Sequence, residues 1–334
     1  MRFLRRGSEP STDAFWSWWA GARDGLDAAI RSDGLEAAAG ADITRAVQGI
    51  DKRLPWEVGP GASAEHAFCL SPAGDPEVRV IALRWLASAP SPDETWEYHA
   101  SKQAAGPDRL VTLRLGDGSE LALADMRAIA SWDERLHLLD VRLWHPEFPA
   151  IPDDLRLEAS FVFLDNLLGE DEVERWIGVI ETLDAPTGGL TPAELCAALS
   201  RNIAEAPTDS WVMAEGEGRD GFFSLIADAS LKRIDLPFHE SHLAVTIRLD
   251  GFPDRATAAH LDADEDVLID LLASTSRQAG RRTDQRRRVI HFVTAEPDVA
   301  RSTTETWRRS LRDRQIDIDV ERDPRWAFMA ELGR

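Results

Sequence analysis

The sequence predicts an α+β fold made of two α/β-sandwich domains, residues 1–185 and 186–334, of which the second is ferredoxin-like. Segments whose apolar residues recur at helical spacing alternate along the chain with short segments in which apolar and polar residues alternate. Residues 184–189 contain one Pro and two Gly and form the clearest boundary. The first observation places helices and strands in both halves, and the second separates the halves.

In the first half, helices are recognised by the residues at their ends. Ser11 or Asp13 can cap a helix that carries a cluster of Phe and Trp. Asp75 caps a later helix with Pro76 at its first position, and Pro90 ends it. The other expected elements are a helix at 41–53, a short strand and turn at 56–61, strands near 65–70 and 96–101, strands 110–115 and 119–123 joined by a turn at 116–118, strands at 139–143 and 175–183, and a buried helix at 161–168.

The second half begins with a capping box. Thr191 and Glu194 can satisfy each other's backbone N–H groups, and Pro192 fits the first position of a helix that runs to about residue 205. Residues 289–293 are apolar on both faces, which predicts a central strand. The other expected elements are strands at 211–216, 222–232, 243–249 and 316–321 and helices at 262–274 and 298–313. The last five elements, from 243 onward, predict the ferredoxin-like unit.

Composition excludes several classes of protein. The chain has 334 residues, of which 43% are hydrophobic, and 38 basic against 59 acidic side chains give a net charge of −21. These values exclude a disordered or collagen-like chain, and two distant cysteines, Cys69 and Cys196, exclude a disulfide scaffold. No apolar stretch approaches 18 residues, and the basic start lacks the apolar core of a signal peptide. We therefore expect a cytoplasmic protein without membrane contact, and the negative charge disfavours nucleic acid as a partner.

Positive charge gathers near the carboxyl end. Residues 1–276 hold 24 basic and 49 acidic side chains, whereas residues 277–334 hold 14 and 10. Guanidinium groups bind phosphate and carboxylate in bidentate fashion, so an arginine-rich loop at 277–288 is a candidate anion or partner site. The candidate residues are Arg277, Arg281, Arg282, Thr283 and Arg286. The alternative is a solvated loop whose arginines pair with the protein's own carboxylates.

Tryptophan is unusually abundant, with 12 residues against a single tyrosine. Trp16, Trp18 and Trp19 fall within four positions of one expected helix, and neighbouring positions on a helix point in different directions. At least one of the three should therefore lie near the surface, where Trp is a frequent interface anchor. The alternative is packing against the second domain.

Other motifs give no site. The sequence contains no nucleophile elbow, phosphate-binding loop or dinucleotide fingerprint. His239 and His242 are three residues apart but lack a well-placed third ligand, so two surface histidines in a turn are expected. The acidic run at 262–266 fits the first turn of a helix better than a calcium loop. We assign no catalytic residue, no metal ligand and no cofactor.

Short motifs occur in order over nearly the whole chain. They are Phe15-Trp16-Ser17-Trp18-Trp19, Ala89-Pro90 with Trp96, Phe163-Leu164-Asp165-Asn166-Leu167-Leu168-Gly169-Glu170, Gly251-Phe252-Pro253, Gly280-Arg281-Arg282-Thr283 and Asp323-Pro324-Arg325-Trp326. Together they resemble bacterial proteins that carry the domain of unknown function numbered 695. The resemblance implies a cytosolic protein whose C-terminal domain is similar in kind to the small ferredoxin-like inhibitors that regulate ribonuclease E. It supplies no catalytic residue, and Arg282 stands where the family commonly has Gln.

The sequence therefore predicts a non-catalytic binding or regulatory protein, similar to an inhibitor, that binds a protein partner or a small anionic ligand. The alternative is an enzyme, a hydrolase or transferase, acting on an anionic or phosphorylated substrate between the domains. In that enzyme the arginines would hold the substrate, and a carboxylate or His291 would act as the base. The sequence leaves the oligomeric state open.

Overall fold

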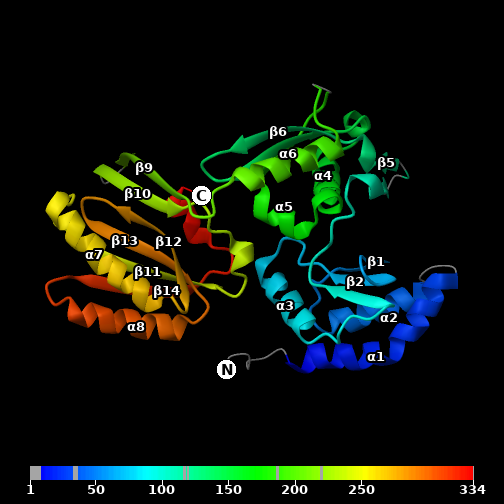
Figure 1. The fold of residues 1–334 in the computed structure, drawn as a ribbon, viewed down its shortest axis with the longest axis horizontal. Coiled ribbons are helices and arrows are strands. Elements are labelled where there is room, and N and C mark those ends of the chain that lie inside the picture. Colours follow the sequence, from blue (N-terminus) through cyan, green and yellow to red (C-terminus); the bar gives the residue numbers. More distant parts are fainter. Residues whose placement is uncertain are drawn as a thin grey trace. The chain divides into compact units, whose positions relative to one another are not determined.

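The computed structural model describes residues 9–32, 37–115, 118, 120–185, 188–218 and 221–333, and it confirms an α+β protein. The chain forms two compact units (Figure 1). The first consists of Met1–Ser131 and Leu139–Ser200, and the second of Trp132–Leu138 and Arg201–Arg334. Within the described residues, no helix is both long enough and apolar enough to cross a membrane.

The first unit begins with helices packed on a small sheet. Its elements are α1 (Glu9–Ser32), α2 (Ala37–Gln48), β1 (Trp56–Pro60), β2 (His66–Leu70), α3 (Pro76–Ala87) and β3 (Trp96–His99). Strand β2 pairs antiparallel with β1 and parallel with β3. As expected, Asp75 caps α3 by accepting a hydrogen bond from the Glu77 N–H at 2.9 Å. The core is aromatic, because Phe15, Trp19 and Phe68 are buried together with other large side chains.

The rest of the first unit combines short strands with three helices. Its elements are β4 (Thr112–Arg114), β5 (Glu120–Ala122), β6 (Arg127–Asp133), β7 (Leu138–Trp144), α4 (Asp153–Leu168), α5 (Glu170–Trp176), β8 (Ile177–Thr182) and α6 (Pro192–Glu205). Strands β4 and β5 pair antiparallel, and the expected turn between them includes residues 116 and 117, which lie outside the described residues. Strands β6, β7 and β8 form a second sheet in that order. The capping box of α6 is confirmed, since Thr191 and Glu194 exchange hydrogen bonds.

The second unit is built on one six-stranded sheet. Its elements are β9 (Trp211–Gly218), β10 (Gly221–Asp228), β11 (Ser241–Arg248), α7 (Arg255–Leu272), β12 (Ser276–Thr283), β13 (Arg287–Thr294), α8 (Pro297–Ser310) and β14 (Ile316–Arg322). The strand order is β14-β11-β13-β12-β10-β9, and every neighbouring pair is antiparallel. From β11 to β14 the chain therefore runs β-α-β-β-α-β, and Figure 1 shows α7 and α8 beside this sheet.

Alternation along the strands gives the sheet two apolar faces. Leu243, Val245 and Ile247 of β11 pack with α7 and α8 in one core. Val293 of β13 belongs to a second, smaller core that is closed by the 3-10 helix η5 (Ala327–Leu332). The other 3-10 helices are η1 (Pro107–Arg109), η2 (Leu123–Asp125), η3 (Phe148–Ala150) and η4 (Arg233–Asp235).

The structure corrects the sequence-based elements in two places near the arginines. Residues 277–288 are not a loop, because β12, a tight turn and β13 form a hairpin there. The acidic run 262–266 does not begin a helix, because α7 starts at Arg255 with Asp254 as its cap. Asp262 and Glu265 in the middle of α7 pair with Arg281 of β12 and Arg288 of β13, so these charges compensate each other inside the unit.

Candidate functional site

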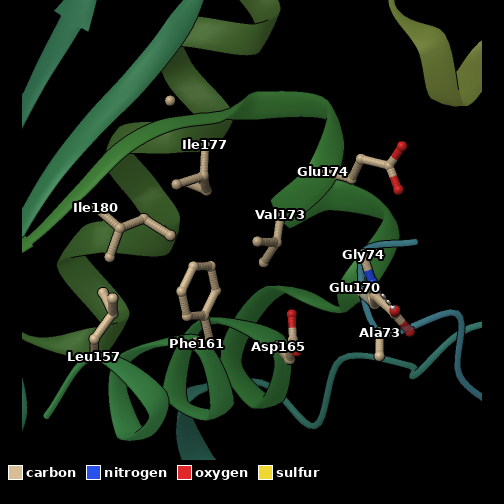
Figure 2. A pocket seen from close by; sticks show the side chains of 11 residues that line it. Ala73, Gly74, Leu157, Phe161, Asp165, Glu170, Val173, Glu174, Ile177 and Ile180 are labelled. Carbon is tan, nitrogen blue, oxygen red and sulfur yellow. Dashed lines mark hydrogen bonds between the residues drawn. The ribbon is translucent and has the colours of Figure 1, made fainter. Parts of the chain in front are cut away.

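A cavity of about 570 Å³ lies in the first unit, between α4, α5, β8 and the turn before α3 (Figure 2). Its lining residues are Ala73, Gly74, Leu157, Phe161, Asp165, Glu170, Val173, Glu174, Ile177, Gly178 and Ile180. The volume is that of a typical small-molecule site, and the lining combines an apolar wall with a few carboxylates.

Helical spacing places the wall. Leu157, Phe161 and Asp165 follow one another at intervals of four on α4, so they lie on one face of the helix. The buried helix predicted at 161–168 is confirmed for Phe163, Leu164 and Leu167, whereas Phe161 is 45% exposed and, with the 39% exposed Leu157, faces the cavity. Figure 2 shows Phe161 and Val173 of α5 on adjacent sides of the cavity.

Gly169 sets the angle between α4 and α5. Its φ is 85°, a left-handed conformation that side chains rarely adopt. A Cβ atom there would also lie 3.1 Å from the backbone nitrogen of Ala104. Glycine at this position lets α5 fold back immediately after α4, so that Val173 and Ile177 reach the same cavity as Phe161.

Asp165 is the one lining carboxyl group for which the described residues supply neither a hydrogen-bond donor nor an ion-pair partner. The pKa of Asp165 is raised to about 6, mainly by burial in the apolar wall and in addition by the charges of Glu170 and Glu57. The ammonium of Lys102 opposes this shift in pKa, and it also pairs with Glu57, at 3.5 Å. A half-buried carboxyl group with a raised pKa at a cavity is a typical mark of a functional site.

The two other carboxylates at the cavity already have partners. Glu170 is buried and accepts hydrogen bonds from the Ser71 hydroxyl at 3.0 Å and from the N–H groups of Lys102 at 3.2 Å and Gly74 at 3.3 Å. Glu174 forms an ion pair with the buried Arg79, whose Nη2 lies 2.6 Å from its Oε2. These contacts fix both carboxylates at one side of the cavity and leave Asp165 available to a ligand.

The structure separates the sequence-predicted arginines. Arg281 is paired internally with Glu265 at 3.0 Å and Asp262 at 2.9 Å. Arg282 instead lies over the ring of Phe223, 4.0 Å from its centroid. Thr283, at the end of β12, is buried, and two further candidates, Arg277 and Arg286, lie at the start of β12 and in the turn before β13. Of the five residues, Arg281 is thus held by carboxylates of α7 and Arg282 by an aromatic ring of β10.

The tryptophans of α1 belong to the aromatic core of the first unit. Trp19 is buried, and its indole N–H donates to the Tyr98 hydroxyl at 2.9 Å. Trp16 is half-buried and donates to the carbonyl of Trp85 at 3.1 Å. Trp18 packs at the edge of the same core and lines a smaller cavity of about 260 Å³ between α1 and α2. Of the three, Trp16 and Trp18 keep part of their surface open to a partner.

Two histidines of the second unit, His242 and His291, lie inside it. His242 is buried, contrary to the expected surface turn, and its Nε2 lies 3.0 Å from Nδ1 of His291. Both rings stack on Phe328. Burial lowers the pKa of His291 to about 3, and the nearby His242 and Arg287 act in the same direction. A neutral, inaccessible imidazole is not suited to serve as a base for a substrate.

One cluster in the described residues has metal-ligand types at short range, namely Asp27, Glu65 and His66. Arg31 donates hydrogen bonds to both Asp27, at 2.8 Å, and Glu65. His66 Nε2 also lies 2.9 Å from the Asp27 carboxylate, so both carboxylates already have partners within the protein.

Comparisons with known proteins give no relative from which a function could be inferred: no family model, no curated protein and no solved structure matches the chain. Asp165 and Glu170 were noted in the sequence only as part of the motif at 163–170 and were not predicted as site residues. The available signal was one acidic residue inside a mostly apolar helical run, four positions after Phe161.

Proposed function

We propose that the protein is a non-catalytic binding protein whose ligand site is the cavity between α4, α5 and β8. The observation that carries this proposal is the Asp165 carboxyl group, which faces an apolar cavity without a hydrogen-bond donor from the described residues. Burial of such a group costs stability unless a ligand or another benefit compensates for it. The exposed Leu157 and Phe161 beside it give a ligand apolar surface to bury.

The wider identification is also a proposal. The strand order β14-β11-β13-β12 supports a ferredoxin-like name for the stretch from β11 to β14. We also propose that residues 1–185 and 186–334 are two domains, that the chain is related to the family of unknown function numbered 695, and that the protein is cytoplasmic. A regulatory role through a protein partner would use the half-buried tryptophans, Trp16 and Trp18, or the arginines of the β12–β13 hairpin, Arg277, Arg282 and Arg286.

The cavity itself favours a cationic ligand, whereas the sequence suggested an anionic one. Three carboxyl groups, Asp165, Glu170 and Glu174, line it, and the guanidinium of Arg79 is already paired. An anion would meet repulsion there. A small anionic ligand is therefore proposed only for the arginines of the second unit.

A larger side chain at the edge of the cavity tests the site. Leu157→Trp extends an indole from an exposed helical position across Phe161 and Ile180, so we expect it to fill the cavity without disturbing the core. The neutral fluorophore Nile red should bind the wild-type protein, and its affinity should fall at least tenfold in Leu157→Trp.

The matched control is Val179→Trp, which adds the same group at an exposed position of β8 that does not line the cavity. It should bind Nile red as the wild type does. Equal binding by the wild type and both variants would show that the probe binds elsewhere and would remove the support for this site.

A further inference from the structure

The chemistry of the cavity restricts its ligand further, and this step rests on the function proposed above. Glu170 already accepts three hydrogen bonds, and Glu174 is neutralised by Arg79. Asp165 is therefore the only carboxyl group of the cavity whose charge the described residues leave without a close partner. Lys102, the cation that acts on Asp165, has its ammonium 3.5 Å from Glu57.

Phe161 adds a second element of recognition. It lies four residues before Asp165 on the same face of α4, and Figure 2 shows its ring and the Asp165 carboxyl group at the same cavity. An aromatic face and a carboxylate both attract an ammonium group, and the apolar wall of Leu157, Val173 and Ile180 can cover a hydrocarbon body. A neutral ligand could at most donate a hydrogen bond and would leave the charge of the half-buried carboxylate uncompensated, which is costly.

We propose that the ligand of this cavity is a small organic monocation, an amine with an apolar body, whose ammonium group binds Asp165 beside Phe161. The shape of the cavity supports a branched or aromatic body rather than a bare aliphatic chain, because apolar side chains line it on several sides.

Recognition by Asp165 makes binding depend on pH in a definite direction. The groups that act on this carboxyl are Glu170, Glu57 and Lys102, with Glu174 at the same cavity, and the pKa of about 6 follows mainly from burial. A cation binds the ionised form. Affinity should therefore be constant above about pH 7 and fall tenfold for each pH unit well below 6.

Three probes of similar shape test the charge: 2-phenylethylammonium, neutral 2-phenylethanol and anionic 3-phenylpropanoate. Calorimetric titration of the full chain at pH 7.5 should give an affinity for the ammonium at least tenfold higher than for the alcohol, and no binding of the carboxylate. Asp165→Asn should abolish the preference for the ammonium, whereas Glu158→Gln, an exposed charge on α4 outside the cavity, should keep it.

The outcomes separate the two proposals. If ammonium and alcohol bind equally and Leu157→Trp removes both, the cavity is a ligand site but the inference of a cation is wrong. If no probe binds the wild type at millimolar concentration, or Leu157→Trp binds all of them normally, both proposals fall. A fourth probe, Nα-acetyl-lysine methylamide, distinguishes the source of the cation. If this probe binds as tightly as 2-phenylethylammonium, the site is assigned to a lysine of a protein partner. The proposal that the ligand is a small amine would then be wrong.

Discussion

The carboxyl group of Asp165 has no evident role in stabilising the fold. Its carboxyl group lies at an apolar cavity, and no described residue donates a hydrogen bond to it, although donors such as the Ser71 hydroxyl lie close enough to serve the neighbouring Glu170. Its pKa is raised, so the folded state holds its proton more tightly than the unfolded chain does. Stability contributed by such an acid is lost as the pH rises from the unfolded pKa near 4 through the folded pKa near 6.

We therefore expect Asp165→Asn to stabilise the protein at neutral pH. The amide is uncharged, so the free energy of unfolding at pH 7.5 should rise by about 1–3 kcal/mol relative to wild type, a range that allows for partial solvent screening. The difference should shrink as the pH falls and vanish below about pH 3, where the wild-type carboxyl is largely protonated in both states. Denaturant titrations at the two pH values measure this, and a variant less stable than wild type at pH 7.5 would contradict it.

The sequence could predict the position of Asp165 but not its environment. A spacing of four places Asp165 on the face of α4 that carries Phe161, and this follows from helical geometry alone. The cavity also requires α5 to fold back at Gly169 and β8 to follow directly. These features depend on packing against residues near Ala104, far away in the sequence, and no local pattern reports them.

At the scale of elements, two predicted caps and the apolar alternation were confirmed, whereas the arginine run was not recognised as part of a strand. The helix that Ser11 or Asp13 was expected to cap begins earlier, at Glu9. Asp75 and Thr191 cap the helices that the sequence assigned to them, and β7 and β11 follow their apolar alternation. Strand β12 was missed because arginine, glutamine and glycine are weak strand formers whose partners come from elsewhere. Those partners are Asp262 and Glu265 in the middle of α7.

The contact between α7 and the β12–β13 hairpin yields a prediction. Glu265 is 2% exposed and accepts hydrogen bonds from Gln278 at 2.6 Å, Arg281 at 3.0 Å and Arg288 at 3.2 Å. Glu265→Gln leaves the buried Arg288 with Asp262 as its remaining acidic partner. We expect a loss of about 2–4 kcal/mol in the free energy of opening, because removing one of two carboxylates leaves the buried positive charges of this network only partly compensated. Hydrogen exchange of the β12 and β13 amides measures it.

The control is an exposed ion pair on the same sheet. Arg248 and Asp317 lie 2.7 Å apart, but both side chains are more than 60% exposed. Asp317→Asn should therefore change the same exchange rates by less than about 1 kcal/mol in free energy. A similar effect of the two substitutions would mean that Glu265 does not hold α7 on the hairpin.

At the scale of the whole molecule, the net charge of the protein is opposite in sign to that of the proposed ligand, as attraction requires. The chain carries a net charge of −21, which attracts cations over a distance set by the ionic strength. The arginines that seemed to offset this charge are in part committed to internal pairs, as Arg281 and Arg288 show. The net charge follows from the composition alone. Which arginines pair with carboxylates inside the protein can be seen only in the folded structure.

Measuring the pKa of the Asp165 carboxyl group is the most direct test of the ligand site proposed at the cavity. Carbon-13 NMR of the full chain labelled at aspartate, assigned with Asp165→Asn, follows this carboxyl through a pH titration. We expect a pKa near 6 for the free protein and a clear decrease when 2-phenylethylammonium is present, because the cation stabilises the ionised form. A pKa near the ordinary value of about 4, unchanged by the amine, would show a solvated carboxyl and would contradict a ligand site at this cavity.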